Sequence, residues 1–329
     1  MSKTGWIVLI VCLCLVLCIC AGLVLAGRMA SSLFSRQSDS GVDTANTKNY
    51  KELNNPFAAD GVYAVQMNEL TDLTIDWISG SVTIELTDGN VIRIEETATS
   101  AISEKNALRY GVSGTKLRIQ ACKKNHTGKL PLKALIVYLP RALAEGLKDL
   151  QIDTVSASVS AWDLDLEELE INTVSGRTSL HSMTAVEAEL NTVSGQTDVR
   201  DASFDSLKIN SISAPTNITA AARKVKASSV SGRMDLALEN GSDVGVSTVS
   251  GPVALSFDKT PRKINVDTTS GRIDLKLPAD ASCAIELDTV SGKLYLNEEA
   301  VGSKQLTFGE GAAEFEVDSI SGSVYVTVK

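Results

Sequence analysis

The sequence is poor in the residues on which common enzymes and nucleic-acid-binding proteins depend. Only two of its 329 residues are histidine, His126 and His181, and aromatic residues make up 5%. Histidine is a frequent general base and metal ligand at neutral pH, so its scarcity argues against both kinds of site. The 31 basic residues are fewer than the 40 acidic ones, and the formal net charge is -9. DNA and RNA are therefore not expected partners, because proteins that bind them present an excess of positive charge.

Motifs that mark a nucleophile or a phosphate site are also missing. The sequence contains no G-x-S-x-G, P-loop or dinucleotide fingerprint, and its Ser-Gly pairs recur as part of a repeat. A serine that returns in every repeat does not define one privileged catalytic centre. We therefore expect a protein that is not an enzyme and that has no cofactor and no bound metal.

The longest uncharged apolar run lies near the N-terminus, where residues 6–26 form a stretch of 21 residues. A helix of that length rises about 31 Å, which matches a bilayer core of about 30 Å. We predict a short polar tail at 1–5, an uncleaved transmembrane signal anchor at 6–27 and a flexible polar linker at 28–58. The lipid bilayer is then a partner through residues 6–27. A cleaved signal peptide is the alternative.

The charges that flank this run do not fix its orientation, because Lys3 and the amino terminus balance Arg28 and Arg36. A short polar tail, an export-type apolar run and a Ser/Thr-rich β domain together are typical of an exported protein. We therefore predict a single-pass protein of the cell membrane whose C-terminal domain is extracytoplasmic.

The cysteines do not form a disulfide framework. Four of the six lie inside the apolar run, at Cys12, Cys14, Cys18 and Cys20, where small apolar filler is the plain interpretation. Cys122 and Cys283 remain, and the sequence does not decide whether these two pair.

A six-residue repeat dominates the rest of the chain. It reads apolar, Asp/Asn/Ser, Thr/Ser, Val/Ile, Ser, Gly, as in INTVSG at 171–176 and LNTVSG at 190–195. The copies end at Gly80, Ala157, Gly176, Gly195, Ala214, Gly232, Gly251, Gly271, Gly292 and Gly322. Between Ala157 and Gly292 these ends are 18 to 21 residues apart, and the last interval lengthens to 30.

A unit of about 19 residues with apolar and polar residues in alternation predicts two short strands and corners. One unit cannot bury its inner face, whereas stacked units bury a continuous core. We therefore predict an all-β fold, with an irregular β region at 59–150 that caps a β-solenoid at 151–329. Within the cap, β-branched residues predict strands at 91–96, 116–121 and 134–140.

Within a repeat, the spacing of apolar residues predicts a corner at Asn191–Thr192. Val193, Thr197 and Val199 then share the inner face, where Gly195 permits close packing. By this interpretation the core column consists of Val174, Val193, Ile212, Val230, Val249, Val290 and Ile320. Thr173, Thr192 and Ser211 are expected to exchange hydroxyl hydrogen bonds between coils, and Asn172, Asn191 and Asn210 to form an amide ladder.

Charged residues recur at fixed places on the predicted outer face. A basic row consists of Arg177, Arg233, Arg272 and Lys293, and an acidic row of Asp198, Asp235 and Asp274. Such rows offer many weak and equivalent contacts, which suit a repetitive polymer. Asp267 and Asp288 share a column on neighbouring coils, where they could hold Ca²⁺, although solvated carboxylates are the simpler interpretation.

The strand ALIVYLP, the segment LQIDTVSASVS and the serial TVSG units resemble a known bacterial group over residues 60–329. This group is the β-strand-repeat domain of unknown function labelled "putative adhesin". The resemblance implies a membrane-anchored envelope protein that is adhesin-like, a scaffold or stress-associated. It also implies a cell-wall polymer, a surface glycan or an envelope protein as partner, and no catalytic residue. Ala157 and Ala214 depart from the motif glycine.

An exported glycan-active enzyme, similar to β-helical polysaccharide lyases or hydrolases, is the alternative function. Its candidate carboxylates are Asp163, Asp165, Glu167, Glu168 and Glu170. Several of them alternate with Trp162, Leu164 and Leu166, which favours the wet face of a half-buried strand.

Overall fold

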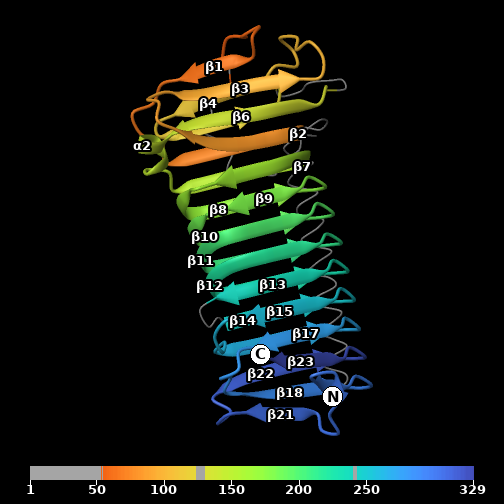
Figure 1. Cartoon of the computed structure of the whole chain (residues 1–329). Coiled ribbons are helices and arrows are strands. Elements are labelled where there is room, and N and C mark those ends of the chain that lie inside the picture. The colour runs from red at the N-terminus through yellow and green to blue at the C-terminus, as the bar shows by residue number, and fades with distance from the viewer. Residues whose placement is uncertain (1–52, 54, 124–129, 240–242) are drawn as a thin grey trace, which may run out of the picture. The chain divides into compact units, whose positions relative to one another are not determined.

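The described part of the chain is all-β, as predicted, with one short helix among its strands (Figure 1). The computed structural model describes residues 53, 55–123, 130–239 and 243–329. They form two compact units, which divide between Thr184 and Ala185. The predicted span at 6–27 lies outside the described residues, and within those residues no helix is long and apolar enough to cross a membrane.

The N-terminal unit contains one short helix and nine strands among its described residues. They are β1 (Val62–Val65), β2 (Asp72–Thr87), β3 (Ile92–Ala98), β4 (Arg109–Ser113), β5 (Lys116–Gln120), β6 (Lys133–Pro140), α2 (Arg141–Ala144), β7 (Asp149–Trp162), β8 (Asp165–Thr173) and β9 (Thr178–His181). The strands predicted in the cap correspond to β3, β5 and β6.

The early repeat copy at 75–80 forms a true coil of this unit. β2 pairs in parallel with β7 on one side, with Gly80 opposite Ala157, and with β5 and β6 on the other. β4 then pairs antiparallel with β5, β3 with β6, and β1 with β3. The antiparallel strands cover the open end of the parallel stack, which would otherwise be free to pair with other chains.

The C-terminal unit holds the regular repeats. Its strands are β10 (Thr184–Thr192), β11 (Thr197–Ser211), β12 (Thr216–Ser229), β13 (Met234–Glu239), β14 (Asp243–Thr248), β15 (Val253–Phe257), β16 (Lys263–Thr268), β17 (Ile273–Leu277), β18 (Cys283–Thr289), β19 (Leu294–Leu296), β20 (Glu299–Ala300), β21 (Gln305–Phe308), β22 (Ala313–Ser319) and β23 (Val324–Val328).

Each coil has one strand before the repeat motif and one after it. The strands before the motif stack in parallel and form what we call the pre-corner face, as β14 and β16 do. The strands after it, such as β15 and β17, form the post-corner face. Alternate side chains point inward from both faces, for example Val246 and Leu255, which are 1% and 0% exposed. Apolar burial between the two faces therefore supplies the core.

The turn between the two faces is closed by a buried hydroxyl. Thr248 is buried, and its Oγ1 accepts a hydrogen bond from the Gly251 amide at 3.1 Å and donates one to the Gly251 carbonyl at 3.4 Å. The same amide-to-hydroxyl bond joins Gly176 to Thr173, Gly195 to Thr192, Ala214 to Ser211, Gly232 to Ser229, Gly271 to Thr268, Gly292 to Thr289 and Gly322 to Ser319. A polar residue can face the core here because its hydrogen bonds are satisfied locally.

The predicted facing of the motif valine was wrong. Strand β10 ends at Thr192, so the turn follows the threonine and not the preceding asparagine. Thr192 points inward, whereas Val193 is half-buried at the corner and Val290 is 61% exposed. The other members of the predicted core column, Val174, Ile212, Val230, Val249 and Ile320, are also only half-buried. The inward placement of Thr197 and Val199 agrees with the structure.

The two predicted polar ladders had different outcomes. The hydroxyls of Thr192 and Ser211 bond the main chain of their own corner, so the predicted exchange between coils was wrong. The amide ladder is present, because Asn210 Nδ2 donates to Asn191 Oδ1 at 2.7 Å. In the N-terminal unit, Asn172 Nδ2 donates to Asp153 Oδ1, which lies opposite it in register, also at 2.7 Å.

The repeat glycines allow the main chains of successive coils to approach closely. A Cβ added to Gly251 would overlap the Gly232 carbonyl oxygen, and one added to Gly176 would overlap the Ala157 carbonyl oxygen. Gly80 has φ +100°, and a Cβ there would overlap the Lys133 carbonyl oxygen. The absence of a Cβ at these positions therefore permits the observed spacing between coils.

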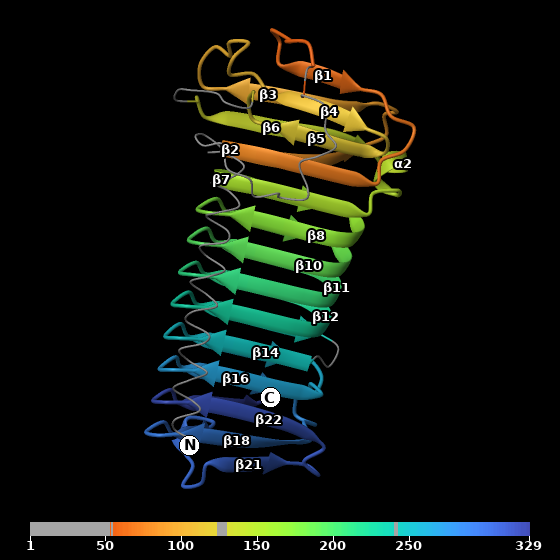
Figure 2. The ribbon, with the colours of Figure 1, turned by 180° about the vertical axis from the view of Figure 1, so that it is seen from behind.

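The long last interval of the repeat reflects a change in spatial order (Figure 2). β22 pairs in parallel with both β16 and β18, and β23 with both β17 and β19. The last coil in the sequence is therefore inserted between the two coils that precede it. The extra residues form β20 and β21, which pair antiparallel with β19 and β18 and cover the end of this unit.

Two neighbouring threonines test the corner. In Thr268→Val, the buried Gly271 amide loses its acceptor at 2.9 Å, and the free energy of unfolding should fall by about 1–3 kcal/mol. Thr269 occupies the motif valine position, and its buried hydroxyl has no hydrogen-bond partner among the described residues. Thr269→Val should therefore leave the free energy of unfolding unchanged or raise it. Denaturant titration of both variants measures the difference, and equal losses would contradict the corner assignment.

Candidate binding surface

Two members of the predicted basic row pair with two members of the predicted acidic row on the post-corner face. Arg233 Nε is 2.6 Å from Asp235 Oδ2, and Arg272 Nη2 is 2.7 Å from Asp274 Oδ1. Each pair joins an arginine directly before a strand to the aspartate two residues later, on β13 (Met234–Glu239) and β17 (Ile273–Leu277). The rows are thus partly neutralised in these two coils, and exposed pairs of this kind contribute at most about 1 kcal/mol each to stability.

Two tyrosines extend this face at the inserted coil. The rings of Tyr325 and Tyr295 stack in parallel with their centroids 4.5 Å apart, and the Arg272 guanidinium lies 3.6 Å from the Tyr325 ring centroid. The rings thus cover one another, so the stack supports the packing of neighbouring coils.

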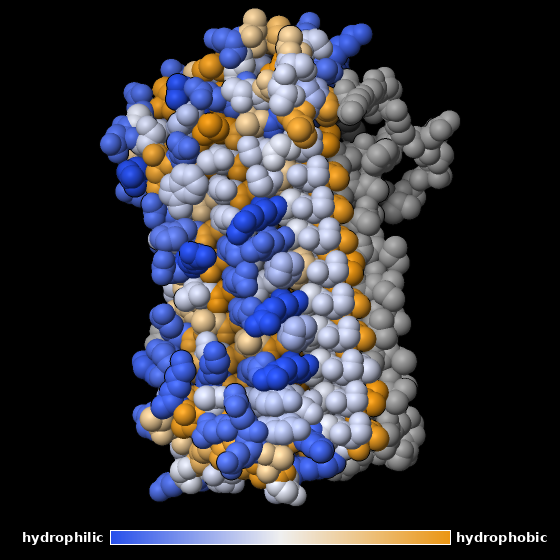
Figure 3. All heavy atoms as spheres, turned by 45° about the vertical axis from the view of Figure 1, so that its right-hand side comes forward, coloured by the Kyte–Doolittle hydropathy of each residue, from blue (hydrophilic) through white to orange (hydrophobic). Residues whose placement is uncertain are grey.

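Hydrophilic side chains gather in a band on the post-corner face, and a narrow apolar row runs beside it (Figure 3). In the C-terminal unit the apolar row corresponds to the half-buried corner residues, including Val193, Ile212, Val230 and Val249. The serines that follow them, such as Ser194 and Ser213, are exposed. The corner thus presents apolar and hydroxyl groups side by side at the repeat spacing.

The carboxylates considered for glycan cleavage lie where the alternation placed them. Asp163, Asp165, Glu167 and Glu168 are exposed and Glu170 is half-buried, while Leu164 and Leu166 are buried. Glu167 Oε1 is 2.7 Å from Lys148 Nζ. These acids therefore form the solvated face of β8, and its apolar residues belong to the core.

The most strongly perturbed carboxylate is Asp153, in a polar cluster on the outer face of the N-terminal unit. Burial, together with the negative charges of Asp76 and Glu170, raises the pKa of Asp153 to about 6, although a hydrogen bond from Asn172 opposes the shift. Gln151 Nε2 also donates to Asp153 Oδ2 at 3.0 Å. Acids with a shifted pKa can mark functional sites. Here the side-chain amides of Asn172 and Gln151 already bond both carboxylate oxygens of Asp153, which favours a structural role.

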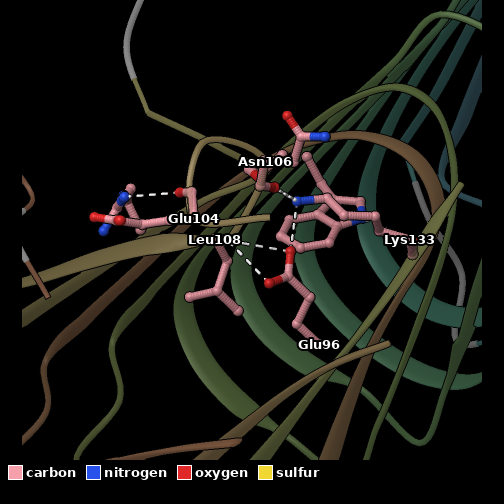
Figure 4. A network of polar contacts seen from close by, with 8 residues as sticks. Glu96, Glu104, Asn106, Leu108 and Lys133 are labelled. Carbon is pink, nitrogen blue, oxygen red and sulfur yellow. Dashed lines mark hydrogen bonds and ion pairs between the residues drawn. The ribbon is translucent and has the colours of Figure 1, made fainter. Parts of the chain in front are cut away.

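Sequence reasoning missed a buried ion pair in the N-terminal unit (Figure 4). The side chains of Lys133 and Glu96 are 2% and 0% exposed, and their Nζ and Oε1 atoms are 2.5 Å apart. Lys133 Nζ also donates to the carbonyl oxygens of Asn106, at 2.7 Å, and Ala121. Burial lowers the pKa of Lys133, while the charge of Glu96 opposes that shift.

The hydrogen bonds of this pair connect several separate segments. Glu96 accepts the Leu108 amide with both carboxylate oxygens, at 3.1 and 2.9 Å, and Trp77 Nε1 donates to the Lys133 carbonyl at 3.1 Å. The three protons of Lys133 Nζ have three acceptors, so the charge is satisfied. The pair therefore holds the segments of the cap together. Glu96 and Lys133 are 37 residues apart and belong to no repeat or motif, so the sequence contained no pattern that predicts their contact.

The column that was expected to contain Asp267 and Asp288 on neighbouring coils contains a third aspartate, Asp318. Asp318, on the inserted β22, lies between Asp267 and Asp288 in register. Burial and the charges of Asp267 and Asp288 raise the pKa of Asp318. Among the described residues, no group of three or more His, Cys, Asp or Glu side chains is arranged to hold a metal ion.

The two cysteines outside the apolar run are free thiols. Cys122 is half-buried and Cys283 is buried. Burial raises the pKa of Cys122, and it raises that of Cys283 to about 11, so neither is primed as a thiolate nucleophile.

Stacked coils, hydroxyl-closed corners and repeated outer rows define a β-solenoid-like repeat protein. The family model described as Toastrack DUF4097 matches residues 70–327, and the chain therefore belongs to this family, a domain of unknown function. This confirms the resemblance that the repeat motif indicated. No curated protein matches the chain.

Two solved structures are similar to the chain at low sequence identity. A "Putative lipid binding protein" from Parabacteroides distasonis ATCC 8503 is 14% identical with a TM-score of 0.50, over 80% of this chain and 95% of that one. A "putative cell adhesion protein" from Clostridium sporogenes ATCC 15579 is 11% identical, over 82% and 98% of the respective chains. The similarity to the first protein indicates a shared fold and nothing about function. The TM-score of 0.20 for the second protein is too low to indicate a shared fold.

The raised pKa of Asp153 predicts a stability that falls as the pH rises. Between about pH 4 and pH 6 the native state keeps a proton that the unfolded state releases, so the free energy of unfolding decreases by up to about 3 kcal/mol. In Asp153→Asn this contribution disappears, and the variant should be more stable than the wild type at pH 7 but not at pH 4. Denaturant titration from pH 4 to 7 measures the crossover, with exposed Asp88→Asn as control. A variant that is less stable at pH 7 would show that the charge is needed.

Proposed function

We propose that this chain is a membrane-anchored, extracytoplasmic binding scaffold of the cell envelope, adhesin-like and without a catalytic centre. One observation carries the proposal: the outer surface repeats from coil to coil. Arg233–Asp235 and Arg272–Asp274 are equivalent pairs, and exposed corner serines recur beside them. A catalytic site requires groups whose environments differ from those of their neighbours, so that acid and base roles separate. Equivalent rows instead favour a partner with its own repeat.

The proposed partner is a cell-wall polymer or a surface glycan. A polymer that lies along several coils would make the same weak contact many times, and the contacts would add up to useful avidity. An envelope protein and a lipid are further classes of partner, the second suggested by the description of the similar Parabacteroides distasonis protein. The stacked coils provide a rigid surface for each of them.

An exported glycan-active enzyme is the alternative. It is favoured by the acids at and beside β8, of which Asp163, Asp165, Glu167 and Glu168 are accessible. The two functions differ in their products, because a scaffold releases the polymer intact and an enzyme releases fragments.

The proposed location predicts a topology. Because the predicted anchor at 6–27 precedes the described residues, protease added to intact cells, with the outer barrier opened where there is one, should remove the described domain and leave a small membrane stub. Immunoblots against tags at both ends of the full chain measure the products, and a cytosolic protein serves as control for lysis. A chain that survives until the cells are lysed would place the domain in the cytosol.

The scaffold function predicts a graded response to the loss of one coil. Deleting Val193–Ser211 removes 19 residues and joins Thr192 to Ile212, which restores a Thr-Ile-Ser-Ala corner. Co-sedimentation of the full-length protein with purified peptidoglycan, together with a glycan array, should show binding that weakens less than about tenfold, because the remaining contacts are equivalent.

The same experiment separates the scaffold from the enzyme. Soluble sugar products are measured after incubation with the polymer, for the wild type and for Asp165→Asn. Products that appear with the wild type and are lost in Asp165→Asn, while the fold persists, would replace the scaffold with the enzyme.

A further inference from the structure

The pre-corner face of the C-terminal unit is a regular grid of outward side chains. Its strands lie in the order β11, β12, β14, β16, β22, β18, and they stay in register without a bulge from Ser206 and its partners onward (Figure 2). Each strand offers three outward positions. In strand order, the first is Ser206, Lys224, Asp243, Lys263, Glu314, Ala284; the second is Lys208, Lys226, Gly245, Asn265, Glu316, Glu286; the third is Asn210, Ser228, Ser247, Asp267, Asp318, Asp288.

Charge on this grid is separated along the stack. Lysines occupy the β11 and β12 end, at Lys208, Lys224 and Lys226. Carboxylates occupy the β22 and β18 end, at Glu314, Glu316, Asp318, Glu286 and Asp288. The inserted last coil contributes three of these five acids, Glu314, Glu316 and Asp318.

The acidic end is not neutralised within the part of the chain that the structure describes. No Lys or Arg there forms an ion pair with any of these five carboxylates. The raised pKa of Asp318, which burial and the neighbouring acids cause, agrees with an excess of negative charge. At the basic end Lys208 is 3.0 Å from Glu189, but both side chains are well exposed, and Lys224 and Lys226 are exposed too.

From this arrangement we infer that the pre-corner face binds a second copy of the same chain, through a two-fold axis that runs parallel to the strands and passes between β14 and β16. Such a rotation reverses the order of the coils and keeps each outward position in its column. β12 then faces β22 of the second copy, β11 faces β18, and β14 faces β16. A two-fold interface must be complementary to itself in this way.

The register makes the match specific at the level of single positions. Lys226 faces Glu316 of the second copy, Lys224 faces Glu314, and Lys208 faces Glu286. In the same arrangement Asp243 faces Lys263. Gly245 at the centre, with no side chain, lets the two faces come close. A rotation about the stacking direction would instead place each coil opposite its own copy and bring like charges together, so charge selects the first arrangement.

The size of the face indicates weak and reversible association. Six strands about 4.8 Å apart and about 20 Å long cover roughly 500 Å² per copy, or about 1,000 Å² in total. Interfaces of this size are at the lower limit for specific complexes. The inference does not depend on the proposed function.

Charge exchange tests the inference with the full-length protein in detergent micelles. Two variants are made, Lys224→Glu/Lys226→Glu and Glu314→Lys/Glu316→Lys, each with two different affinity tags. Capture on one tag and quantitation of the other measures self-association of each variant, and also association in a mixture of the two. The control is Lys276→Glu/Lys293→Glu, which makes the same charge change as the first variant but on the post-corner face. Thermal melts confirm that all variants fold.

We expect wild-type association to weaken at high salt, because screening shortens the reach of the charges. Each variant alone should associate at least about tenfold less than the wild type, and the control should match the wild type. The mixture should recover, because the introduced acids on β12 of the first variant meet the introduced lysines on β22 of the second. The other contact keeps the wild-type lysines and acids. No association of the wild type at about 100 μM, equal association of all variants, or a mixture that fails to recover would each overturn the inference. Equal association in particular would place the contact outside the pre-corner face.

Discussion

The hydrogen bond from the repeat glycine amide to a buried Thr or Ser hydroxyl three residues earlier is the interaction on which the coils depend. It allows the chain to leave one face and enter the other without an unsatisfied polar group inside. Because the hydroxyl is satisfied at its own corner, as in Thr248 with Gly251, the threonine faces the core and the following valine is displaced outward. The glycine then lets the next coil approach closely, and close, equal spacing brings outward side chains into columns.

The inserted last coil shows how a small change in chain path alters a surface. Were the coils stacked in sequence order, Asp267 would neighbour Asp288 directly. Because β22 enters between β16 and β18, Asp318 separates them, and Glu314 and Glu316 lie directly beside Lys263 and Asn265 of β16. The outermost coil is then covered by antiparallel strands, which protects the edge from pairing. Edge protection and the order of the acids at this end thus arise from one topological step.

The N-terminal unit uses a different means to hold its less regular segments. Strands β2, β3 and β6 meet at Glu96 and Lys133, whose charges are buried and fully hydrogen-bonded. Such a pair contributes little net stability compared with apolar packing, but the loss of one partner would leave an uncompensated charge. Asp153 lies in a similar setting on the outer face, where amides satisfy a carboxylate that burial makes costly to ionise. Both networks are closed on themselves, which favours a structural role for each.

The sequence by itself determined the all-β class, the length of the coil, the family and the alternation that makes the acids beside β8 a solvated face. These properties follow from the local periodicity and composition of the sequence, which recur in every repeat. It did not determine which way Thr192 and Val193 face. Their polarity alone predicts that the valine points into the core, whereas the hydroxyl of Thr192 is hydrogen-bonded at the corner, so the threonine points inward and the valine outward. It also did not reveal the Glu96–Lys133 pair or the place of Asp318. The register between strands far apart in the chain decides both, and only the tertiary structure contains it.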